Sequence, residues 1–586
     1  MARGQILKIV GITALILGII VSAFTGLSRT PLFQPIEGLT AEVAREMLEN
    51  GNWFEPHFNY SIYADKPPLF YWVTIPGLKL FGNTELGARF GLALVGLAEI
   101  ILVFLLGRLL YGSLAGLMGA AALACSIGHI IFTRLMMVDM LFSASVTVAF
   151  LCFSLGYVKE RRRLLWWTLA GVCAGMAVLT KSLIGLVFPV SALGLFILLT
   201  HQSGLLKQKP ALGALIGFLV VVIPWHLYMM LRVPGFAYHY FWNEQVLRFL
   251  DMREPRDYVG TGLPLFLLSV LVWALPWSLF IPHIIWGFRH RKKDDSNRGL
   301  LARYLPWLWM GSVIGFFSFT PARLFYYTIP ALPAFALLAG WFWSEVGNLD
   351  GKMFRWTLAL VLATVAIISA PSIFVIPNLG GQIVPLETQK NMLRPLLLVG
   401  ICIAIGVVMA IITVLMKRYR AAFWFLSLFM LFSCIPLSRV LIAFGGYISL
   451  RNLLPAVEPL ISPSDVVVHR FVKDDQSEMV FYLKRKVRVL KRPGEFHQPI
   501  LGNSEGYYIE ESEFERLWNS ETPVFLMVSH HAFVDMPPEA PPIEATILAR
   551  NGEIFICCNP AAAQRINPQK ASISKSVNLK REGRGI

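Results

Sequence analysis

Residues 6–27 read ILKIVGITALILGIIVSAFTGL, an apolar run long enough to cross a lipid bilayer as a helix. Lys8 is the only charged residue within the run, and Arg3 precedes it. The run is longer than the core of a signal peptide and has no obvious small-residue cleavage site. We therefore predict a retained membrane helix near the start of the chain.

The composition of the whole chain is typical of a protein that crosses the membrane many times. Of its 586 residues, 56% are hydrophobic and 15% are charged, and the mean hydropathy is +0.60. A soluble protein needs less apolar sequence to fill its core. Further apolar windows lie at residues 90–107, 113–129, 140–157, 164–180, 183–200, 211–230, 262–287, 304–320, 328–344, 356–377, 395–416 and 421–443. With the first run they predict a polytopic α-helical protein of about thirteen spans.

The basic residues predict the orientation of these spans. If the spans alternate in direction, one side receives the N-terminus and the basic residues at 108, 159–163, 207–209, 289–293, 352–355 and 417–420. By the positive-inside rule that side is the cytoplasm, so the C-terminal region is expected in the periplasm of a bacterium, outside its inner membrane. The formal net charge of +16 suits anionic membrane lipids or phosphates. The sequence has no basic arm with interleaved aromatic residues, so it does not indicate a nucleic-acid partner.

The sequence divides into three regions after this assignment. We predict a membrane domain at residues 1–444 with a long outer loop at 28–85, an extracytoplasmic α/β domain at 445–562, and a basic tail at 563–586. The tail is polar without periodicity, which is typical of disorder.

Several short patterns indicate the elements of the α/β domain. Strands are predicted for SDVVVHRF at 464–471, for PVFLMVS at 523–529, and for the arms of a hairpin around Asn551-Gly552. Ser512 and Glu515 have the spacing of a capping box and predict a helix over 512–519. The pair Cys557-Cys558 lacks the CxxC spacing of metal sites, so we expect it to lie in a strand.

The outer loop at 28–85 is long enough to carry a function. Glu37 lies where the first span leaves the bilayer, and Thr40 is expected to cap a short helix that ends at Asn50-Gly51. The helix would have an apolar face and an acidic face, formed by Ala41, Ala44 and Leu48 and by Glu42, Glu46 and Glu49. We expect this helix to lie along the membrane surface.

The same loop ends in the segment Asp65-Lys66-Pro67-Pro68. Side chains of neighbouring residues diverge, so Asp65 and Lys66 are not expected to pair with each other. Pro67 disfavours a helical Lys66, and the two prolines fix the backbone that follows. A lysine held in this way can bind a phosphate as a point charge. The alternative is an exposed ion pair before a turn.

Two ionisable residues lie at junctions between predicted spans on the outer side. Asp139 follows the third apolar window, and Lys181 follows the fifth. Burial of such residues in a membrane is costly, which makes them functional candidates. The alternatives are that Lys181 extends to the interface, that Asp139 forms a structural pair with Arg134, and that Glu37 is only a helix-end charge.

Further cationic and aromatic residues are predicted on the same face. They are Arg232, His239 and Arg248 in one loop and Arg323, Tyr326 and Tyr327 in another. Several cations with two or three acids at an outer membrane face suit a lipid-linked phosphate substrate.

The order of these motifs resembles a known family. The segments are EGLTAEVAREM (37–47), ADKPPLFYW (64–72), RLMMVDM (134–140), VLTK (178–181), PGFAYHYFWNEQVLRF (234–249) and RLFYYTIPALPA (323–334). As a set they are similar to the GT-C membrane glycosyltransferases of the protein O-mannosyltransferase and ArnT-type superfamily. The resemblance covers about the first 345 residues, and ArnT-type members also carry a C-terminal outer-face domain.

The resemblance implies an enzyme that moves a sugar from a polyprenyl phosphate, such as undecaprenyl phosphate, to lipid A, another envelope glycan or a protein, with inversion. It implies catalytic roles for Glu37 and Asp139, binding of the donor phosphate by Lys66, Lys181, Arg248, Arg323 and Tyr327, and substrate positioning by Asp65 and Glu244. An acidic residue would act as a general base toward a hydroxyl acceptor. An acceptor that is already an anion needs no base.

The chain departs from the family pattern at two places. Many relatives carry two acids where this chain has Ile36-Glu37. ArnT-type enzymes often have His-Glu-His where this chain has Asn243-Glu244-Gln245. Because the histidines of a zinc site of that type are missing, we predict no structural metal there, while a divalent cofactor elsewhere stays open.

Two other classes of function compete with the transferase. A flippase or secondary transporter of lipid-linked sugars would favour internal repeats and charges near the middle of the membrane, and this sequence shows neither. A non-catalytic binding member of the family is the other alternative, because one of the two acids is missing.

Overall fold

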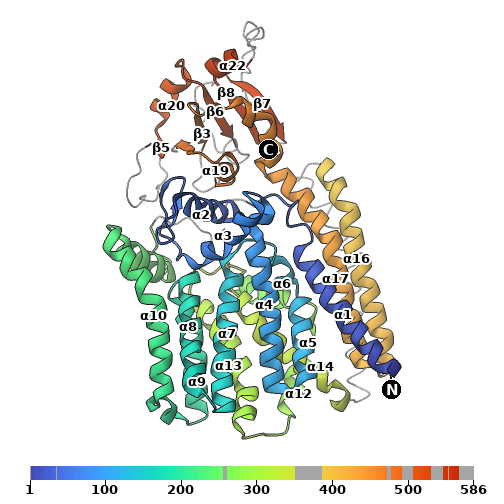
Figure 1. Cartoon of the computed structure of the whole chain (residues 1–586). Coiled ribbons are helices and arrows are strands. Elements are labelled where there is room, and N and C mark those ends of the chain that lie inside the picture. Colours follow the sequence, from blue (N-terminus) through green and yellow to red (C-terminus); the bar gives the residue numbers. More distant parts are fainter. Residues whose placement is uncertain are drawn as a thin grey trace. The chain divides into compact units, whose positions relative to one another are not determined.

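A computed structural model describes residues 2–33, 36–254, 260–349, 386–470, 477–490, 506–528, 545–551 and 554–566. The chain divides into two compact units (Figure 1). The membrane unit comprises Met1–Ser28 and Ala64–Leu441, and the sheet unit comprises Arg29–Tyr63 and Ile442–Ile586. The first half of the outer loop therefore groups with the α/β domain, whereas Asp65 and Lys66 belong to the membrane unit.

Seven of the described helices are long and apolar enough to cross a bilayer. They are α4 Glu85–Tyr111, α7 Val138–Lys159, α8 Arg163–Lys181, α10 Lys209–Arg232, α13 Asn297–Phe319, α16 Leu386–Leu415 and α17 Tyr419–Ile448. The chain is thus a multi-pass membrane protein.

Other described helices belong to the membrane unit, and all but the first of them are shorter than those seven. They are α1 Ala2–Phe24, α3 Leu69–Phe81, α5 Ser113–Ala124, α6 Ile127–Phe132, α9 Ile184–Leu199, α11 Leu263–Trp273, α12 Ile281–Arg289 and α14 Leu332–Glu345. One π-helix, η2 Tyr238–Leu247, and short 3-10 turns at Ser203–Lys207 (η1), Trp277–Phe280 (η3), Ile329–Ala331 (η4) and Val346–Leu349 (η5) connect them.

The prediction of a multi-pass helical protein is confirmed, whereas the predicted number of about thirteen continuous spans is not. The window 262–287 holds a helix pair, Leu263–Trp273 and Trp277–Arg289, bent by 98°, and counting this pair as one span gives eight. The window 113–129 is divided between α5 and α6, and the window 356–377 lies outside the described residues. Hydropathy measures apolar length along the sequence and does not register where a helix breaks or bends.

Small residues allow α8 and α10 to pack backbone against backbone. A Cβ atom on Gly171 of α8 would lie 1.9 Å from the carbonyl oxygen of Ala214, and one on Gly217 of α10 would lie 2.4 Å from that of Thr168. Such small-residue contacts replace the hydrophobic effect as a source of helix association in lipid. They hold the first half of α8 close against α10.

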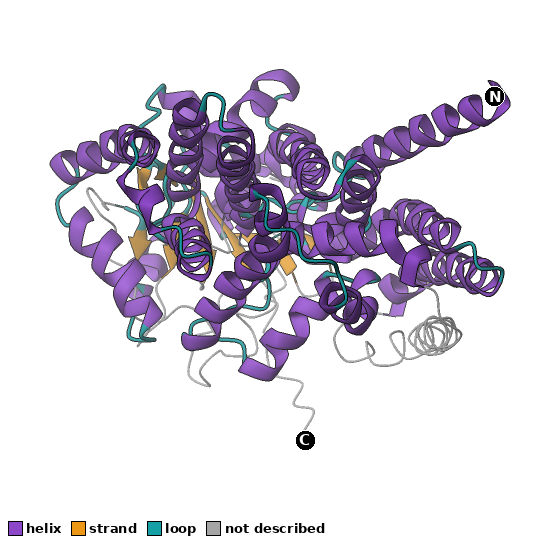
Figure 2. Ribbon diagram, turned by 90° about the horizontal axis from the view of Figure 1, so that it is seen from below, coloured by secondary structure: helices purple, strands orange, loops and turns teal. Residues whose placement is uncertain are grey.

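Among its described residues the sheet unit contains a six-stranded sheet in the order β5-β4-β3-β6-β8-β7, whose strands are coloured orange in Figure 2. Their bounds are β3 Val466–Arg470, β4 Arg488–Leu490, β5 Tyr508–Ile509, β6 Val524–Val528, β7 Thr546–Asn551 and β8 Ile554–Cys558. β3, β4, β5 and β6 run parallel, and β8 is antiparallel to β6 and β7. The predicted strands, the hairpin and the placement of Cys557-Cys558 in a strand are confirmed.

The two faces of the sheet bury different side chains, which explains the apolar run in β3. Val467 packs in one core with Met479 of α19 Ser477–Leu483. Val468 packs in the other core with Phe514 of α20 Glu511–Trp518. Successive residues of a strand point to opposite faces, so a parallel strand covered on both sides is apolar throughout.

Residues from the outer loop belong to this unit through hydrogen bonds as well as packing. Helix α2 Ile36–Asn50 and the short strands β1 His57–Phe58 and β2 Ser61–Ile62 form this segment. The Asn59 side chain donates to the Val487 carbonyl at 2.7 Å and accepts from its N–H at 2.9 Å. The remaining elements are η7 Leu450–Asn452, α18 Leu454–Val457, η8 Glu458–Leu460 and α22 Pro560–Ile566.

Three local predictions are wrong. Helix α2 begins at Ile36, so Thr40 lies inside it and its hydroxyl donates to the Ile36 carbonyl at 3.0 Å. Two of the three residues of its acidic face, Glu42 and Glu46, are 0% exposed, whereas a surface helix would expose all three. Helix α20 begins after Glu510 without a side-chain cap, so no capping box forms.

The predicted tail at 563–586 also needs a different boundary. Helix α22 continues to Ile566, and Ala562 of this helix packs in the core of the sheet unit. The rest of the predicted tail, residues 567–586, lies outside the described residues.

Candidate active site

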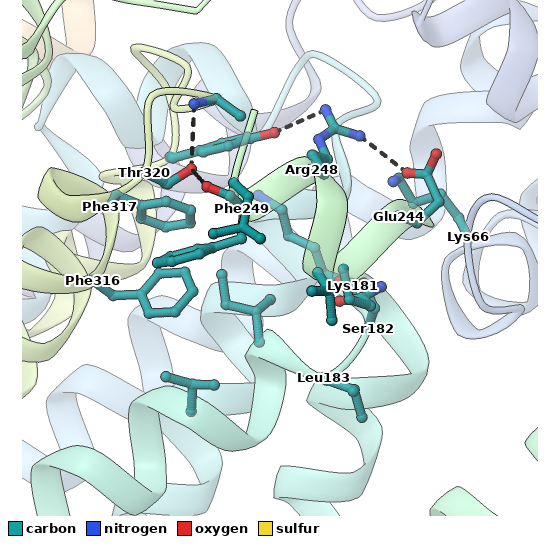
Figure 3. Close-up of a pocket in the computed structure, with 17 residues that line it drawn as sticks. Lys66, Lys181, Ser182, Leu183, Glu244, Arg248, Phe249, Phe316, Phe317 and Thr320 are labelled. Atoms are coloured by element: carbon teal, nitrogen blue, oxygen red, sulfur yellow. Dashed lines mark hydrogen bonds and ion pairs between the residues drawn. The ribbon is translucent and has the colours of Figure 1, made fainter. Parts of the chain in front are cut away.

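A cavity of about 380 Å³ in the membrane unit gathers most of the predicted site residues (Figure 3). Three cations line it, Lys66, Lys181 and Arg248, together with one carboxylate, Glu244, and the hydroxyl-bearing Tyr327. Its apolar wall includes Leu183, Ile184, Val187, Phe249, Phe316 and Phe317. The cavity therefore offers a cationic group of side chains next to a hydrophobic surface.

Asp65 and Lys66 diverge as predicted. The Asp65 carboxylate lies 2.7 Å from Nε2 of His239, whereas Lys66 lines the cavity. Pro68 is the residue before α3, with φ −83°, so the two prolines connect Lys66 directly to a helix. Burial lowers the pKa of the Lys66 amine below its ordinary value, and the Glu244 carboxylate opposes this shift.

Asp139 and Lys181 form an ion pair across two neighbouring helices. Asp139 lies in the first turn of α7 and Lys181 at the end of α8, so each charge suits the dipole of its own helix. The Asp139 side chain is 1% exposed and that of Lys181 is 10% exposed. The Lys181 ammonium also lies 4.1 Å from the centre of the Tyr327 ring, a cation–π distance.

This pairing decides between the alternatives for both residues. Lys181 is held by Asp139 and Tyr327, which does not fit a lysine that extends to the interface. The Arg134 guanidinium donates instead to the carbonyls of Ile130 and Ser22, so the alternative Asp139–Arg134 pair is not formed.

Arg248 is placed by the π-helix η2 that precedes it. Its guanidinium donates to Glu244 at 3.2 Å and to the Tyr327 hydroxyl at 3.3 Å. π-Helical turns are rare and are frequent at functional sites. This one places Glu244 and Arg248 together on the cavity wall (Figure 3).

Comparison with known proteins supports the resemblance seen in the motifs. Residues 65–228 match the family of dolichyl-phosphate-mannose-protein mannosyltransferases. The undecaprenyl phosphate-alpha-4-amino-4-deoxy-L-arabinose arabinosyl transferase 1 of Pseudomonas fluorescens is 30% identical over 372 residues, which are 61% of this chain and 62% of that protein. An uncharacterized protein of Aquifex aeolicus is 30% identical over 356 residues, 60% of this chain and 68% of that protein.

The fold agrees with these matches. The crystal structure of ArnT from Cupriavidus metallidurans bound to undecaprenyl phosphate superposes with a TM-score of 0.79, covering 95% of this chain and 98% of that one at 22% identity. The chain belongs to the ArnT-type GT-C glycosyltransferases. The sequence match spans less than two thirds of the Pseudomonas arabinosyl transferase.

Sequence reasoning missed one side chain next to the cavity of this ArnT-type protein. Arg253 is 3% exposed, and its guanidinium contacts Glu244 and lies 3.9 Å from Asp65. Arg253 belongs to none of the family motifs and lies in an irregular segment after the motif PGFAYHYFWNEQVLRF (234–249). Its position after the RF of that motif was the only available signal.

Among the described residues, one group could also hold a metal ion. Asp65, His239 and Glu244 each offer a ligand atom, and these atoms lie within 4.8 Å of one another. This group shares only Glu244 with the triplet Asn243-Glu244-Gln245, which stands where ArnT-type enzymes often have His-Glu-His. It contains one histidine and two carboxylates, and both of these ligand types bind zinc in proteins.

Two other predicted site residues do not line the cavity. Arg323 donates to the carbonyl oxygens of Thr320, at 2.5 Å, and Ser318, at 3.4 Å, near the end of α13. Glu37 belongs to the sheet unit, where it is 2% exposed in the first turn of α2 and accepts a hydrogen bond from the Phe33 N–H at 2.8 Å. Both contacts are of the kind that stabilises helix ends.

Proposed function

We propose that the chain is an inverting glycosyltransferase that takes its sugar from a polyprenyl phosphate and transfers it to lipid A, another envelope glycan or a protein. The observation that carries the proposal is the cavity in which Lys66, Lys181 and Arg248 meet beside an apolar wall. The related arabinosyl transferases carry undecaprenyl phosphate in their names, which fits this choice of donor.

The charges of the cavity suit the phosphate of such a donor. Three cations and one carboxylate line it, so a phosphate would meet an excess of positive charge. Arg248 supplies a planar fork of donors, and Lys66 and Lys181 supply point charges. The Tyr327 hydroxyl, which already accepts from Arg248, can donate its own proton to a phosphate oxygen.

The apolar part of the cavity suits the lipid. Phe249, Phe316 and Phe317 form an aromatic wall, continued by Leu183 and Val187. A prenyl chain is branched and apolar, and it gains about 25 cal/mol for each Å² removed from water. We assign this wall to the first prenyl units behind the phosphate.

The reaction needs stabilisation of charge more than covalent chemistry. As the bond from the anomeric carbon to the phosphate oxygen breaks, the sugar becomes oxocarbenium-like and negative charge grows on the leaving phosphate. Cations already in place lower the barrier because they need no reorganisation. The acceptor oxygen attacks the opposite face of the sugar, which inverts the anomeric carbon without an enzyme-bound intermediate.

The acids have different roles in this scheme. Asp139 holds Lys181 and is thereby a positioning residue, and Asp65 and Glu244 position Lys66 and Arg248. Glu37 stays a candidate for orienting the acceptor or, with a hydroxyl acceptor, for accepting its proton.

The proposal is tested by transfer in a purified system. Undecaprenyl phosphate-aminoarabinose serves as the first donor probe, and lipid A, envelope glycan fragments and periplasmic proteins serve as acceptors. We expect release of undecaprenyl phosphate only when a suitable acceptor is present. Mass spectrometry of lipid A, envelope glycans and glycoproteins from cells with and without the protein identifies the modification. Movement of intact donor across a vesicle membrane, with no transfer, would favour a flippase.

The proposed location is the bacterial inner membrane, with the N-terminus in the cytoplasm and the sheet unit in the periplasm. This orientation rests on the distribution of Lys and Arg. Reporter fusions at residue 207 and after residue 566 test it. A fusion after residue 566 that reports the cytoplasm would contradict the orientation.

A further inference from the structure

A buried cation, Arg253, lies within the charge network beside the cavity. Asp65, His239 and Glu244 present ligand atoms within 4.8 Å of one another. The ArnT-type resemblance implies zinc near this part of the chain, so the group has to be tested as a metal site. Two carboxylates and an imidazole fit a divalent ion by chemistry alone.

A side chain already supplies the positive charge that this group needs. Nε of Arg253 contacts one oxygen of Glu244, and Nη2 lies 3.9 Å from Oδ2 of Asp65. The Arg253 side chain is 2% exposed, and that of Glu244 is also 2% exposed. Buried charges are stable only when they are paired, and here both members of the pair are buried together.

The chain holds Arg253 in this position through a residue that replaces a family histidine. The Asn243 side chain donates to the carbonyl of Glu254 at 2.6 Å and accepts from its N–H at 3.0 Å. An amide can donate and accept at once, whereas a metal-bound histidine could not make both bonds. The Asn243 substitution and the inward position of Arg253 therefore belong together.

A metal ion does not fit beside this arginine. A divalent ion bound to Asp65 and Glu244 would lie within a few Å of the guanidinium, and like charges at that distance repel strongly in a buried setting. Arg253 also cannot lose its proton to relieve the repulsion. The side chains of Asp65, His239 and Glu244 could bind a metal ion by themselves. The same site with Arg253 in place cannot.

We propose that Arg253 is a built-in cation that takes the place of a divalent metal in this chain. It joins the Asp65 carboxylate, and with it the Lys66 segment, to Glu244 and so to Arg248. Its role in holding Lys66 and Arg248 for the donor phosphate rests on the proposed function. Its occupation of the metal position does not rest on the proposed function. The occupation and the positioning role are therefore tested separately.

A zinc-binding measurement tests whether Arg253 occupies the metal position, and it needs no sugar donor. The full chain is purified in detergent, stripped with a chelator, and titrated with zinc alone by calorimetry and elemental analysis. We expect the unaltered protein to bind no stoichiometric zinc. Arg253→Ala should bind one equivalent, and the double variant with His239→Ala should lose it. Arg232→Ala, which changes an exposed arginine at the end of α10, should bind none.

Two results would overturn this part of the proposal. One is a stoichiometric zinc in the unaltered protein that His239→Ala removes. The other is a folded Arg253→Ala that takes up no zinc, because the arginine would then be a simple structural pair. If Arg253→Ala fails to fold, Arg253→Gln keeps most of the volume and answers the same question.

Donor kinetics test the positioning role. We expect Arg253→Gln to raise KM for the polyprenyl phosphate donor about 10- to 100-fold, as is common for residues that orient ligand-binding groups. Arg253→Lys, which keeps the charge, should recover much of the loss, and chelators should leave the unaltered protein unchanged. Equal losses in Arg253→Gln and Arg253→Lys would contradict a role for the charge. If no donor is transferred at all, the proposed function fails while the zinc result stands.

Discussion

Both units contain a network of buried charges, but the two networks are composed differently. In the membrane unit three cations and one carboxylate face a common cavity. In the sheet unit a single arginine, Arg45, meets Glu42 and Glu49 at 2.7 Å each, and the Tyr60 N–H donates to Glu46 at 2.9 Å. The first network has an excess of positive charge next to open space. The second has an excess of acid and is buried except at one edge, where Glu49 and Tyr60 are exposed.

The difference separates binding from structure. In the sheet unit the guanidinium of Arg45 donates to two carboxylates and to the Tyr60 hydroxyl. The network therefore holds α2 against the turn that contains Tyr60. In the membrane unit Lys66 and Arg248 point at a cavity that a ligand can enter. A buried charge is therefore a candidate for direct contact with a ligand only when it also reaches open space.

The largest effect is expected from Lys66→Ala. Removal of one preorganised cation from a charge-developing site costs about 100- to 1,000-fold in rate, and the transfer rate should fall by that amount. Thermal unfolding of the full chain should be unchanged, since Lys66 belongs to no hydrophobic core. The control is Lys79→Ala, an exposed lysine on α3. Normal transfer by Lys66→Ala would remove the basis of the phosphate assignment.

A smaller effect is expected from Asp139→Asn. This variant leaves Lys181 in the cavity without its acidic partner, and we expect a loss of about 10- to 100-fold in transfer. If Asp139 acts through Lys181, the double variant Asp139→Asn/Lys181→Ala should lose no more activity in total than Lys181→Ala alone. A double-mutant cycle measures this directly. Full additivity of the two losses would instead favour an independent catalytic role for Asp139, such as a general base.

The sequence predicted much of this site because its parts follow from chain order. Helices α7 and α8 are consecutive and of similar length, so an acid at the start of one and a lysine at the end of the other must meet. The direction of Lys66 followed from the prolines after it. Arg253 could not be predicted in this way, since its place depends on two hydrogen bonds between Asn243 and the backbone of Glu254.

Predictions of the outer loop failed for a related reason. The pattern at 41–49 has an apolar face and an acidic face, which is typical of a helix at a surface. Here Glu42 and Glu46 of the acidic face are buried, because Arg45 and the backbone of Tyr60 satisfy their carboxylates. Tyr60 has a positive φ of 62°, and this turn cannot be recognised in an Asn-Tyr pair. Amphipathicity indicates which side chains share a face and leaves open what covers each face.

The pH dependence of stability should distinguish the two networks. Burial, with repulsion from Glu42, raises the pKa of Glu46 from 4.5 to about 9. A group with a raised pKa in the folded state stabilises that state fully below about pH 4.5, and this contribution is lost as the pH rises toward 9. Glu46→Gln mimics the protonated acid and removes the loss. At pH 8 the free energy of unfolding of this variant should exceed that of the unaltered protein by at least about 1 kcal/mol, which corresponds to a shift of one pKa unit.

Measurement of unfolding from pH 5 to pH 9 checks this expectation. The gap between Glu46→Gln and the unaltered protein should widen as the pH rises, while sugar transfer at a fixed temperature stays the same. A constant gap, or a variant less stable throughout, would show that Glu46 is ionised in the folded chain. The network would then resemble an ordinary ion cluster.

The smallest effect is expected at the open end of the same cluster. Glu49 is bound to Arg45 at 2.7 Å but its side chain is 48% exposed, so water screens the pair and replaces it readily. We expect Glu49→Gln to change the free energy of unfolding by about 0.5 kcal/mol or less. Arg45 keeps its two bonds to Glu42 in this variant, so α2 should stay in place. A loss as large as that from a buried pair, about 3 kcal/mol, would mean that the cluster acts as one unit and that burial of its inner members depends on its outer one.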